Sequence, residues 1–123
     1  MANEMTVTMS ISYAKGTDTW NKEVVSEQHD VSGTARAGGT YTTTGSAVNI
    51  PKGNIGSTVG FGYFRNIDSA NSIDIGYDDS GFKILITLLA GMSCWLRFKA
   101  STVPQAKETS SGTPVLEYML FSV

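Results

Sequence analysis

The sequence predicts an all-β protein, an antiparallel two-sheet sandwich of jelly-roll-like type with about seven or eight strands. Three observations lead to this fold class. Apolar and polar residues alternate in several short segments, turn-forming residues separate these segments, and no segment shows the apolar period of a helix. Because no helix is available to cover a sheet, each apolar sheet face must be buried against another sheet.

The clearest strand runs from Met5 to Tyr13, where every second residue is apolar and the residues between are Thr and Ser. One face of this strand should therefore meet a core, and the other should meet water or a polar partner. A second strand is expected over residues 19–27. The small polar segment 31–46 is expected to be a long loop or a weak strand around residues 41–44, where β-branched Thr favours extended backbone.

Further strands are expected in the middle of the chain. A short strand over residues 47–50 should end at a turn that begins with Pro51. Residues 59–63 and 73–77 alternate on either side of a five-residue polar break, which is the pattern of two antiparallel strands joined by a short loop. The segment Asp78–Gly81 is expected to form the next turn.

The last strands are expected over residues 82–88, 94–98 and 115–121, with a polar loop over 102–112. The strand at 82–88 has apolar residues at both alternating sets of positions, so we expect it to be covered on both sides.

Length and charge limit the function classes. The 123 residues suit one domain over residues 1–123, with room for an extended arm within residues 1–5 and for the long polar loop 31–46. The formal net charge is −2, and the basic residues are scattered with no run of three, so we expect no binding to nucleic acid. The longest apolar run is too short to span a bilayer, and no secretory signal is recognisable, so we expect no membrane partner and synthesis in the cytoplasm.

Four aspartates, Asp68, Asp74, Asp78 and Asp79, lie within a dozen residues. They lack the spacing and the closing Glu of a calcium loop, and nothing indicates an apolar pocket of the kind that raises the pKa of a catalytic acid. Aspartate is common in turns because its carboxylate accepts hydrogen bonds from nearby backbone N–H groups. We therefore expect turn aspartates, and no metal or cofactor.

No catalytic set is recognisable. His29 is followed by Asp30, but no G-x-S-x-G segment supplies a nucleophilic serine. Cys94 is the single cysteine and lies in an apolar strand, so we expect it to be a core residue and not a nucleophile. The sequence predicts that the protein is not an enzyme.

Exposed apolar and aromatic side chains are the better functional candidates. Met5 and Val7 lie on the first strand, Trp20 is flanked by polar residues, and Tyr41 lies in the polar segment. We expect these four residues to form a partner interface, because large aromatic side chains are frequent interface anchors. Stacking against a sugar is the alternative use of the aromatic residues.

Three segments resemble a known family: YFRNIDSANSIDIGYDDSG at 63–81, FKILITLLAGMSCWLRF at 82–98, and VLEYMLF at 115–121. Their order is similar to that of small virion structural proteins of tailed bacteriophages, of the capsid decoration or cement type. The resemblance covers residues 59–123, about half of the chain, and residues 15–55 do not share it.

The resemblance implies a β-sandwich protomer that assembles as a homo-oligomer, often a trimer, on the outside of a phage capsid. Its partners would be the major capsid protein and further copies of itself, and its role would be to stabilise the shell without catalysis. Residues 1–5 and 31–46 are candidate arms, and the strand at 5–13 is a candidate for pairing with a neighbouring chain. The first alternative is a tail-fibre tip or another receptor- or carbohydrate-binding module, with exposed aromatics in one groove. The second is a small enzyme, in which His29 would share a pocket with Asp30, Asp74 or Asp78.

Overall fold

The computed structural model describes residues 4–31, 35–56, 59–99, 102–109 and 112–122, with the backbone alone for Val24 and Val25. Within these ranges the chain forms ten strands and no helix, and all strand pairs are antiparallel. The predicted all-β antiparallel sandwich is therefore confirmed. The same ranges contain no helix of the length and hydropathy that a membrane span requires.

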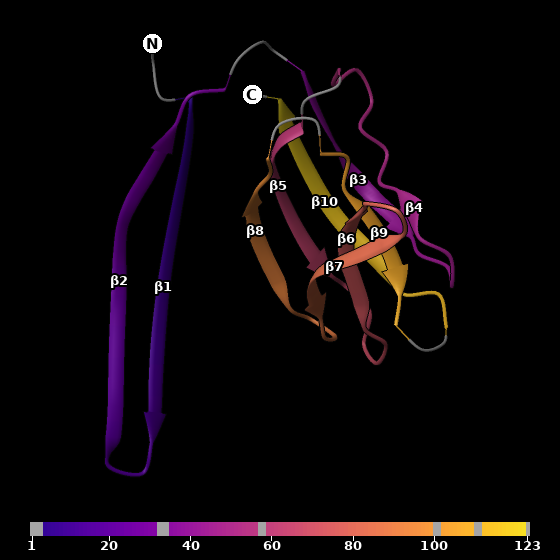
Figure 1. The fold of residues 1–123 in the computed structure, drawn as a ribbon. Coiled ribbons are helices and arrows are strands. Elements are labelled where there is room, and N and C mark those ends of the chain that lie inside the picture. The colour runs from indigo at the N-terminus through magenta and orange to yellow at the C-terminus, as the bar shows by residue number, and fades with distance from the viewer. Residues whose placement is uncertain (1–3, 32–34, 57–58, 100–101, 110–111, 123) are drawn as a thin grey trace. The chain divides into compact units, whose positions relative to one another are not determined.

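Contacts divide the chain into two units, residues 1–32 and 33–123. The first unit is a β-hairpin of β1 (Met5–Lys15) and β2 (Asp18–His29), drawn in indigo and purple in Figure 1. Gly16 has a φ of 61° and lies in the two-residue loop, where a hairpin turn of this length favours glycine. The ribbon is roughly 37 Å long at about 3.4 Å per residue. The two strands that the alternation predicts are confirmed, and both extend further than predicted.

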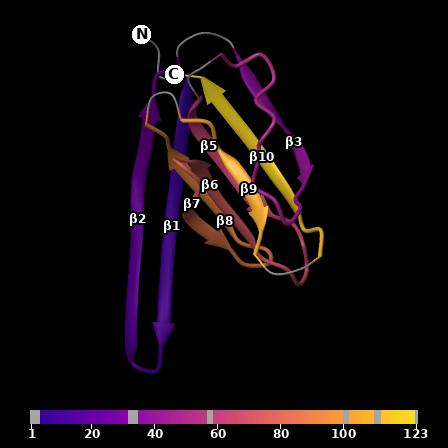
Figure 2. The same cartoon turned by 45° about the vertical axis from the view of Figure 1, so that its right-hand side comes forward.

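The second unit is a sandwich of two four-stranded sheets (Figures 1 and 2). The first sheet, in spatial order, contains β3 (Arg36–Thr42), β10 (Val115–Ser122), β5 (Val59–Asn66) and β8 (Ser93–Arg97). The second sheet contains β4 (Val48–Asn49), β9 (Gln105–Glu108), β6 (Ile73–Asp78) and β7 (Phe82–Leu88). This interleaved order is that of an eight-stranded jelly roll.

The core lies between the two sheets. Every second residue of β10 points inward, and Leu116, Tyr118 and Leu120 are buried there. From β5, Phe64 enters the same cluster and meets Phe98 edge-to-face, with ring centroids 6.0 Å apart. Ile73 and Ile75 of β6 close the core from the second sheet. The alternation that predicted a two-layer fold thus supplies its interior.

The predicted pairing of residues 59–63 with 73–77 is wrong. These residues lie in β5 and β6, which belong to different sheets: β5 pairs with β8 and β10, whereas β6 pairs with β7 and β9. The polar break between them is a crossover from one layer to the other. Alternation predicts that a strand exists but does not identify its neighbour, and here the neighbours come from distant parts of the chain.

Two segments that read as polar loops contain strands. In the segment 31–46, β3 starts at Arg36, earlier than the predicted weak strand at 41–44, and in the segment 102–112, β9 spans Gln105–Glu108. Neither stretch has the composition of a strand. β3 is stabilised as a strand by pairing with β10, and β9 by pairing with β6. Tertiary contacts therefore override the weak strand propensity of these residues. Of the candidate arm at 1–5, residues 1–3 lie outside the described residues.

The expectation that residues 82–88 are covered on both sides is also wrong. β7 is the edge strand of its sheet, and Ile84 and Leu85 are 57% and 49% exposed. Its pairing with β6 is irregular at this point, where Gly76 lies opposite Ile84. A Cβ at Gly76 would overlap the carbonyl oxygen of Lys83, so glycine lets the two backbones approach.

The fully buried side chain of Asn66 joins the two layers. Its amide nitrogen donates to the carbonyl oxygens of Asn71 (2.7 Å) and Leu88 (3.0 Å), and its amide oxygen accepts from the backbone N–H of Asp68 (2.9 Å). The bond to Leu88 connects the end of β5 in the first sheet to the end of β7 in the second. A buried amide is tolerated here because these bonds satisfy both of its polar atoms.

We expect Asn66→Ala to lower the free energy of unfolding by about 2–4 kcal/mol, because it leaves buried backbone groups without partners. Denaturant unfolding followed by tryptophan fluorescence measures the change. Asn54→Ala is the matched control, since Asn54 is an exposed turn residue and its replacement should change stability by less than about 0.5 kcal/mol. Equal losses in the two variants would contradict the role assigned to Asn66.

Candidate functional site

Three of the four predicted interface residues share one face of the hairpin, and the fourth does not. Met5 and Val7 are half-buried on β1, and Trp20 on β2 is 52% exposed. Tyr41 belongs to β3 in the other unit, where it packs against the sandwich core. Tyr41 is in this respect a core residue, and the predicted set does not form a single surface.

The strand register defines the two faces of the hairpin. Met5, Val7, Ile11 and Tyr13 of β1 lie opposite His29, Glu27, Lys22 and Trp20 of β2, respectively. Residues directly opposite one another in an antiparallel pair project to the same side. We call Met5, Val7, Met9, Ile11, Tyr13 and Trp20 the apolar face of the hairpin. The other face carries Thr, Ser and amide side chains and the carboxylate of Glu23, which lies opposite Ser10. Two of its hydroxyl groups, on Thr8 and Ser26, form a cross-strand hydrogen bond of 2.9 Å.

The apolar face is exposed over much of its length. Met9 and Ile11 are each 46% exposed and Tyr13 is 43% exposed, so the expectation that this side of the strand meets a core is wrong for these residues. Sequence reasoning selected Met5, Val7 and Trp20 but passed over these three, although the same alternation contains them all. A two-stranded ribbon alone is marginally stable in water, so an exposed apolar face of this length indicates a binding surface.

The open end of the hairpin is closed by a hydrogen bond. The carboxylate of Glu4 accepts a bond of 3.1 Å from the backbone N–H of Val31, and this bond lowers the pKa of Glu4. Close by in the chain, Nε2 of His29 lies 3.4 Å from a carboxylate oxygen of Glu27. His29 is the last residue of β2 and is partly buried.

A second candidate surface is the outward side of the sheet β3–β10–β5–β8. Arg36, Arg65 and Arg97, which are all the arginines of the chain, alternate with inward-pointing core residues and so project outward. The same register places Phe61, Tyr63, Trp95, Met119 and Phe121 on this side, where Phe61 itself is buried at 3% exposure. We call these eight residues the arginine face. Glu117 lies on the same side, directly opposite Arg65. Arginine and aromatic side chains are the residue types enriched at interface hot spots.

Packing within the arginine face fixes its centre. The rings of Phe61 and Trp95 stack with centroids 5.2 Å apart and an interplanar angle of 10°, and the guanidinium of Arg97 lies 4.7 Å from the Phe61 centroid. Arg97 also donates to the carbonyl oxygens of Gly60 and Phe98. A guanidinium beside an aromatic ring gains a cation–π attraction, which orients the side chain. Little in the sequence indicates this face, because Arg97 alone lies within a predicted strand. The strand register places Arg36 and Arg97 at one level across the sheet and Arg65 opposite Glu117.

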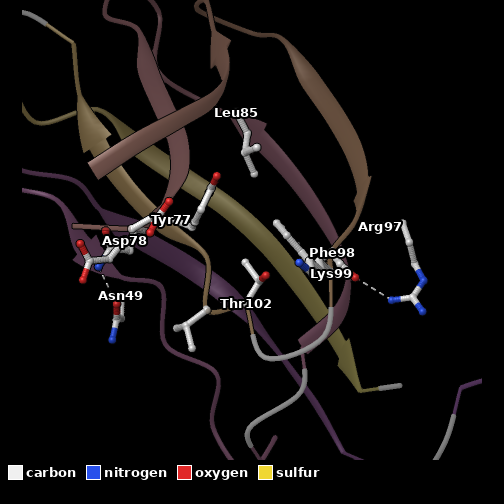
Figure 3. A pocket seen from close by; sticks show the side chains of 11 residues that line it. Asn49, Tyr77, Asp78, Leu85, Arg97, Phe98, Lys99 and Thr102 are labelled. Atoms are coloured by element: carbon white, nitrogen blue, oxygen red, sulfur yellow. Dashed lines mark hydrogen bonds between the residues drawn. The ribbon is translucent and has the colours of Figure 1, made fainter. Parts of the chain in front are cut away.

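A third candidate is a pocket of about 790 Å³ in the sandwich (Figure 3). Tyr77, Asp78 and Asn49 lie on one side of it, and Arg97 and Phe98 lie on the other. The amide of Gln105 donates a 2.8 Å hydrogen bond to the side chain of Asn49. An aromatic ring beside carboxylate and amide groups offers a stacking surface and hydrogen-bonding partners for a polar ligand.

The clustered aspartates act mainly in turns, as predicted. The Asp68 carboxylate accepts from the backbone N–H groups of Asn71 (2.7 Å) and Ala70 (2.9 Å), and these bonds lower its pKa. Asp78 accepts from the N–H of Gly81 at 3.0 Å. Asp74 instead accepts a 2.6 Å bond from the hydroxyl of Thr87 across two strands. Among the described residues no group of three or more His, Cys, Asp or Glu side chains is arranged to hold a metal ion.

Cys94 lies where the sequence predicted, packed against the sandwich core. Burial raises the pKa of its thiol to about 11, well above the ordinary value, because the thiolate is poorly solvated there. The thiolate is the nucleophilic form, so this environment makes the thiol unreactive at neutral pH.

Comparison with protein-family models, curated proteins and solved structures finds no match to this chain.

The thiol of Cys94 predicts a loss of stability at high pH. In the unfolded chain it ionises near pH 9, whereas in the folded protein it keeps its proton until about pH 11. The unfolded state therefore holds fewer protons between these values, and stability should fall as the pH rises through this range. Thermal unfolding from pH 7 to 11 measures the fall, which should be smaller in Cys94→Ser. An identical pH profile in both proteins would contradict the assigned burial.

Proposed function

We propose that this protein is a structural component of a tailed-bacteriophage virion, which binds the outside of the capsid and stabilises it by binding alone. The observation that carries the proposal is the exposed apolar face of the hairpin, with Met9, Ile11, Tyr13 and Trp20 each more than 40% exposed. A two-stranded ribbon has no further layer of its own to cover an apolar face. Exposed apolar surface of this extent therefore favours burial against another protein. The resemblance of residues 59–123 to small phage virion proteins supports a capsid protein as that partner.

A stabilising protein of this kind needs at least two adhesive surfaces, since it must hold two neighbours at once. The hairpin supplies one of them. The arginine face supplies the other, because Arg36 and Arg65 are exposed and are set among aromatic side chains. In this scheme the arginine face binds the major capsid protein, and the hairpin links copies of the chain to one another. Many weak contacts on one particle then add up through avidity.

The jelly-roll fold is compatible with this role. Jelly rolls occur in viral capsid proteins and also in lectins, so the fold by itself supports both a capsid function and a sugar-binding function. The low content of charged residues, 16%, supports the capsid function, because few charged groups must be desolvated at a protein contact.

A second candidate function is glycan binding by the sandwich, as in a receptor-binding module. The observation in its favour is the pocket at Tyr77, Asp78 and Asn49. Sugar rings stack on aromatic faces, and their hydroxyl groups bond to carboxylates and amides. On a capsid surface the two functions are compatible with one another.

The capsid function predicts that charge reversal on the arginine face releases the protein from particles. We expect Arg36→Glu with Arg65→Glu to lower its affinity for undecorated capsids roughly tenfold or more, because complementary charge becomes like charge at the contact. Co-sedimentation of the purified protein with capsids measures the bound fraction.

The control is Lys83→Glu with Lys52→Glu, which changes the net charge equally at positions away from the arginine face. Melting temperatures of both double variants check that they fold. Binding that is lost equally in both would point to net charge as the cause, and wild-type protein that binds no capsid would remove the proposal.

The glycan function predicts that Tyr77→Ala abolishes binding to sugars in a glycan array, since it removes the stacking ring. Tyr13→Ala is the matched control, because Tyr13 is an exposed tyrosine on the hairpin and outside the pocket. If the wild-type protein binds no glycan, or if both variants bind as the wild type does, the pocket is not a sugar site.

A further inference from the structure

To be buried, the apolar face of the hairpin requires a partner surface of similar length. The ribbon has two strands of 11 and 12 residues, and its exposed apolar residues run from Met9 to Trp20 at the turn. Pairing at a strand edge would extend the ribbon sideways and leave this face in water. Packing of a second sheet face-to-face, at the usual spacing of about 10 Å, would bury it.

The charges on this face follow a pattern along the ribbon. Lys22 lies opposite Ile11, and Glu27 lies opposite Val7. Ile11 and Val7 are each two residues from Met9 on β1, so a cation and a carboxylate flank Met9 on opposite sides. The register shifts between Val7 and Met9, so β2 has one extra residue on the Glu27 side. Both Lys22 and Glu27 are exposed.

This pattern is self-complementary in one orientation only. We propose that two copies of the chain pack the apolar faces of their hairpins together in antiparallel orientation, about a two-fold axis at Met9. Lys22 of each copy then lies over Glu27 of the partner subunit, and the two symmetric contacts pair opposite charges. Tyr13 and Trp20 at the turn of one ribbon cover Met5 and His29 at the open end of the other.

Other arrangements of copies fit the charges less well. Two ribbons packed face-to-face in parallel, about an axis along their length, place Lys22 over Ile11 of the partner subunit and Glu27 over Val7 of the partner subunit, which removes both charges from water without a charged partner. Three parallel ribbons around a three-fold axis bring Lys22 to the level of Lys22 and Glu27 to the level of Glu27. Like charges at a contact oppose association. The pairing deepens the proposed function, on which it rests for its biological setting, by naming a second copy as the partner of the hairpin.

The contact is small, which sets the expected affinity. A face about 37 Å long and about 11 Å wide covers on the order of 400 Å², so two copies bury on the order of 800 Å². Stable complexes usually bury more than about 1,200 Å². The isolated protein should therefore form a weak, concentration-dependent dimer, which attachment of many copies to one shell reinforces.

The first test is sedimentation equilibrium of the isolated full-length protein at concentrations up to about 1 mM. We expect a monomer–dimer equilibrium that Met9→Asp abolishes, because it places a carboxylate at the centre of the apolar contact. Thr6→Asp adds the same charge on the polar face, opposite the neutral Gln28, and should leave the dimer intact. A protein that is monomeric throughout, or a dimer equally sensitive to both variants, would overturn the pairing.

The second test exchanges the charges and so reports the orientation. Lys22→Glu and Glu27→Lys should each weaken the dimer on the order of tenfold, since each variant places like charges at both symmetric contacts. The double variant Lys22→Glu with Glu27→Lys restores opposite charges and should recover the wild-type dissociation constant. In a parallel pair each charge lies over an apolar residue, and in a trimer like charges already meet, so in neither arrangement would the single variants weaken association and the double variant restore it. That result, or a trimeric mass, would overturn the antiparallel arrangement.

These experiments use no capsids, so they separate the two proposals. A protein that dimerises as described but does not co-sediment with capsids would retain the hairpin pairing and lose the capsid function. A protein that binds capsids but stays monomeric in solution would retain the capsid function and lose the pairing.

Discussion

Each sheet of this protein has an apolar face that must be removed from water, and the structure as a whole depends on this constraint. The constraint follows from the pleat, because alternating side chains project to opposite sides of a strand. In the sandwich each sheet covers the other, and residues such as Phe64, Leu116 and Ile75 become fully buried. The hairpin has the same alternation but only two strands. Several of its apolar residues therefore remain exposed, and in the proposed function they bind a partner.

Polar groups complete the sandwich where apolar packing ends. Asn66 connects the end of β5 to the end of β7, and Thr43, which is also fully buried, bonds through its hydroxyl to the carbonyl oxygen of Pro114 at 2.8 Å. Both residues lie next to the ends of strands, where backbone groups lose their ladder partners. Such bonds add modest net stability, but they specify how the chain crosses between the layers.

The adhesive chemistry of the molecule is divided between its two units. The hairpin offers Met, Ile, Val, Tyr and Trp with few charges, and the arginine face offers guanidinium groups set among aromatic rings. The first surface suits burial against a similar apolar face, and the second suits a partner that carries carboxylates. A protein that holds neighbouring subunits together benefits from surfaces of different chemistry, because each then selects a different partner. This is the physical basis of the proposed structural role.

The sequence by itself determined the fold class, most of the strands and the turn role of Asp68 and Asp78, because these follow from residue periodicity and local hydrogen bonding. It did not reveal β3 and β9, whose small or polar residues become strands only through pairing with β10 and β6. Tertiary structure also decided that β5 and β6 lie in different sheets, that β7 is an exposed edge, and that Tyr41 serves the sandwich core. Strand pairing joins residues far apart in the chain, whereas alternation is a local property, and alternation alone does not tell a face that meets a core from one, like that of Met9 and Ile11, that meets water.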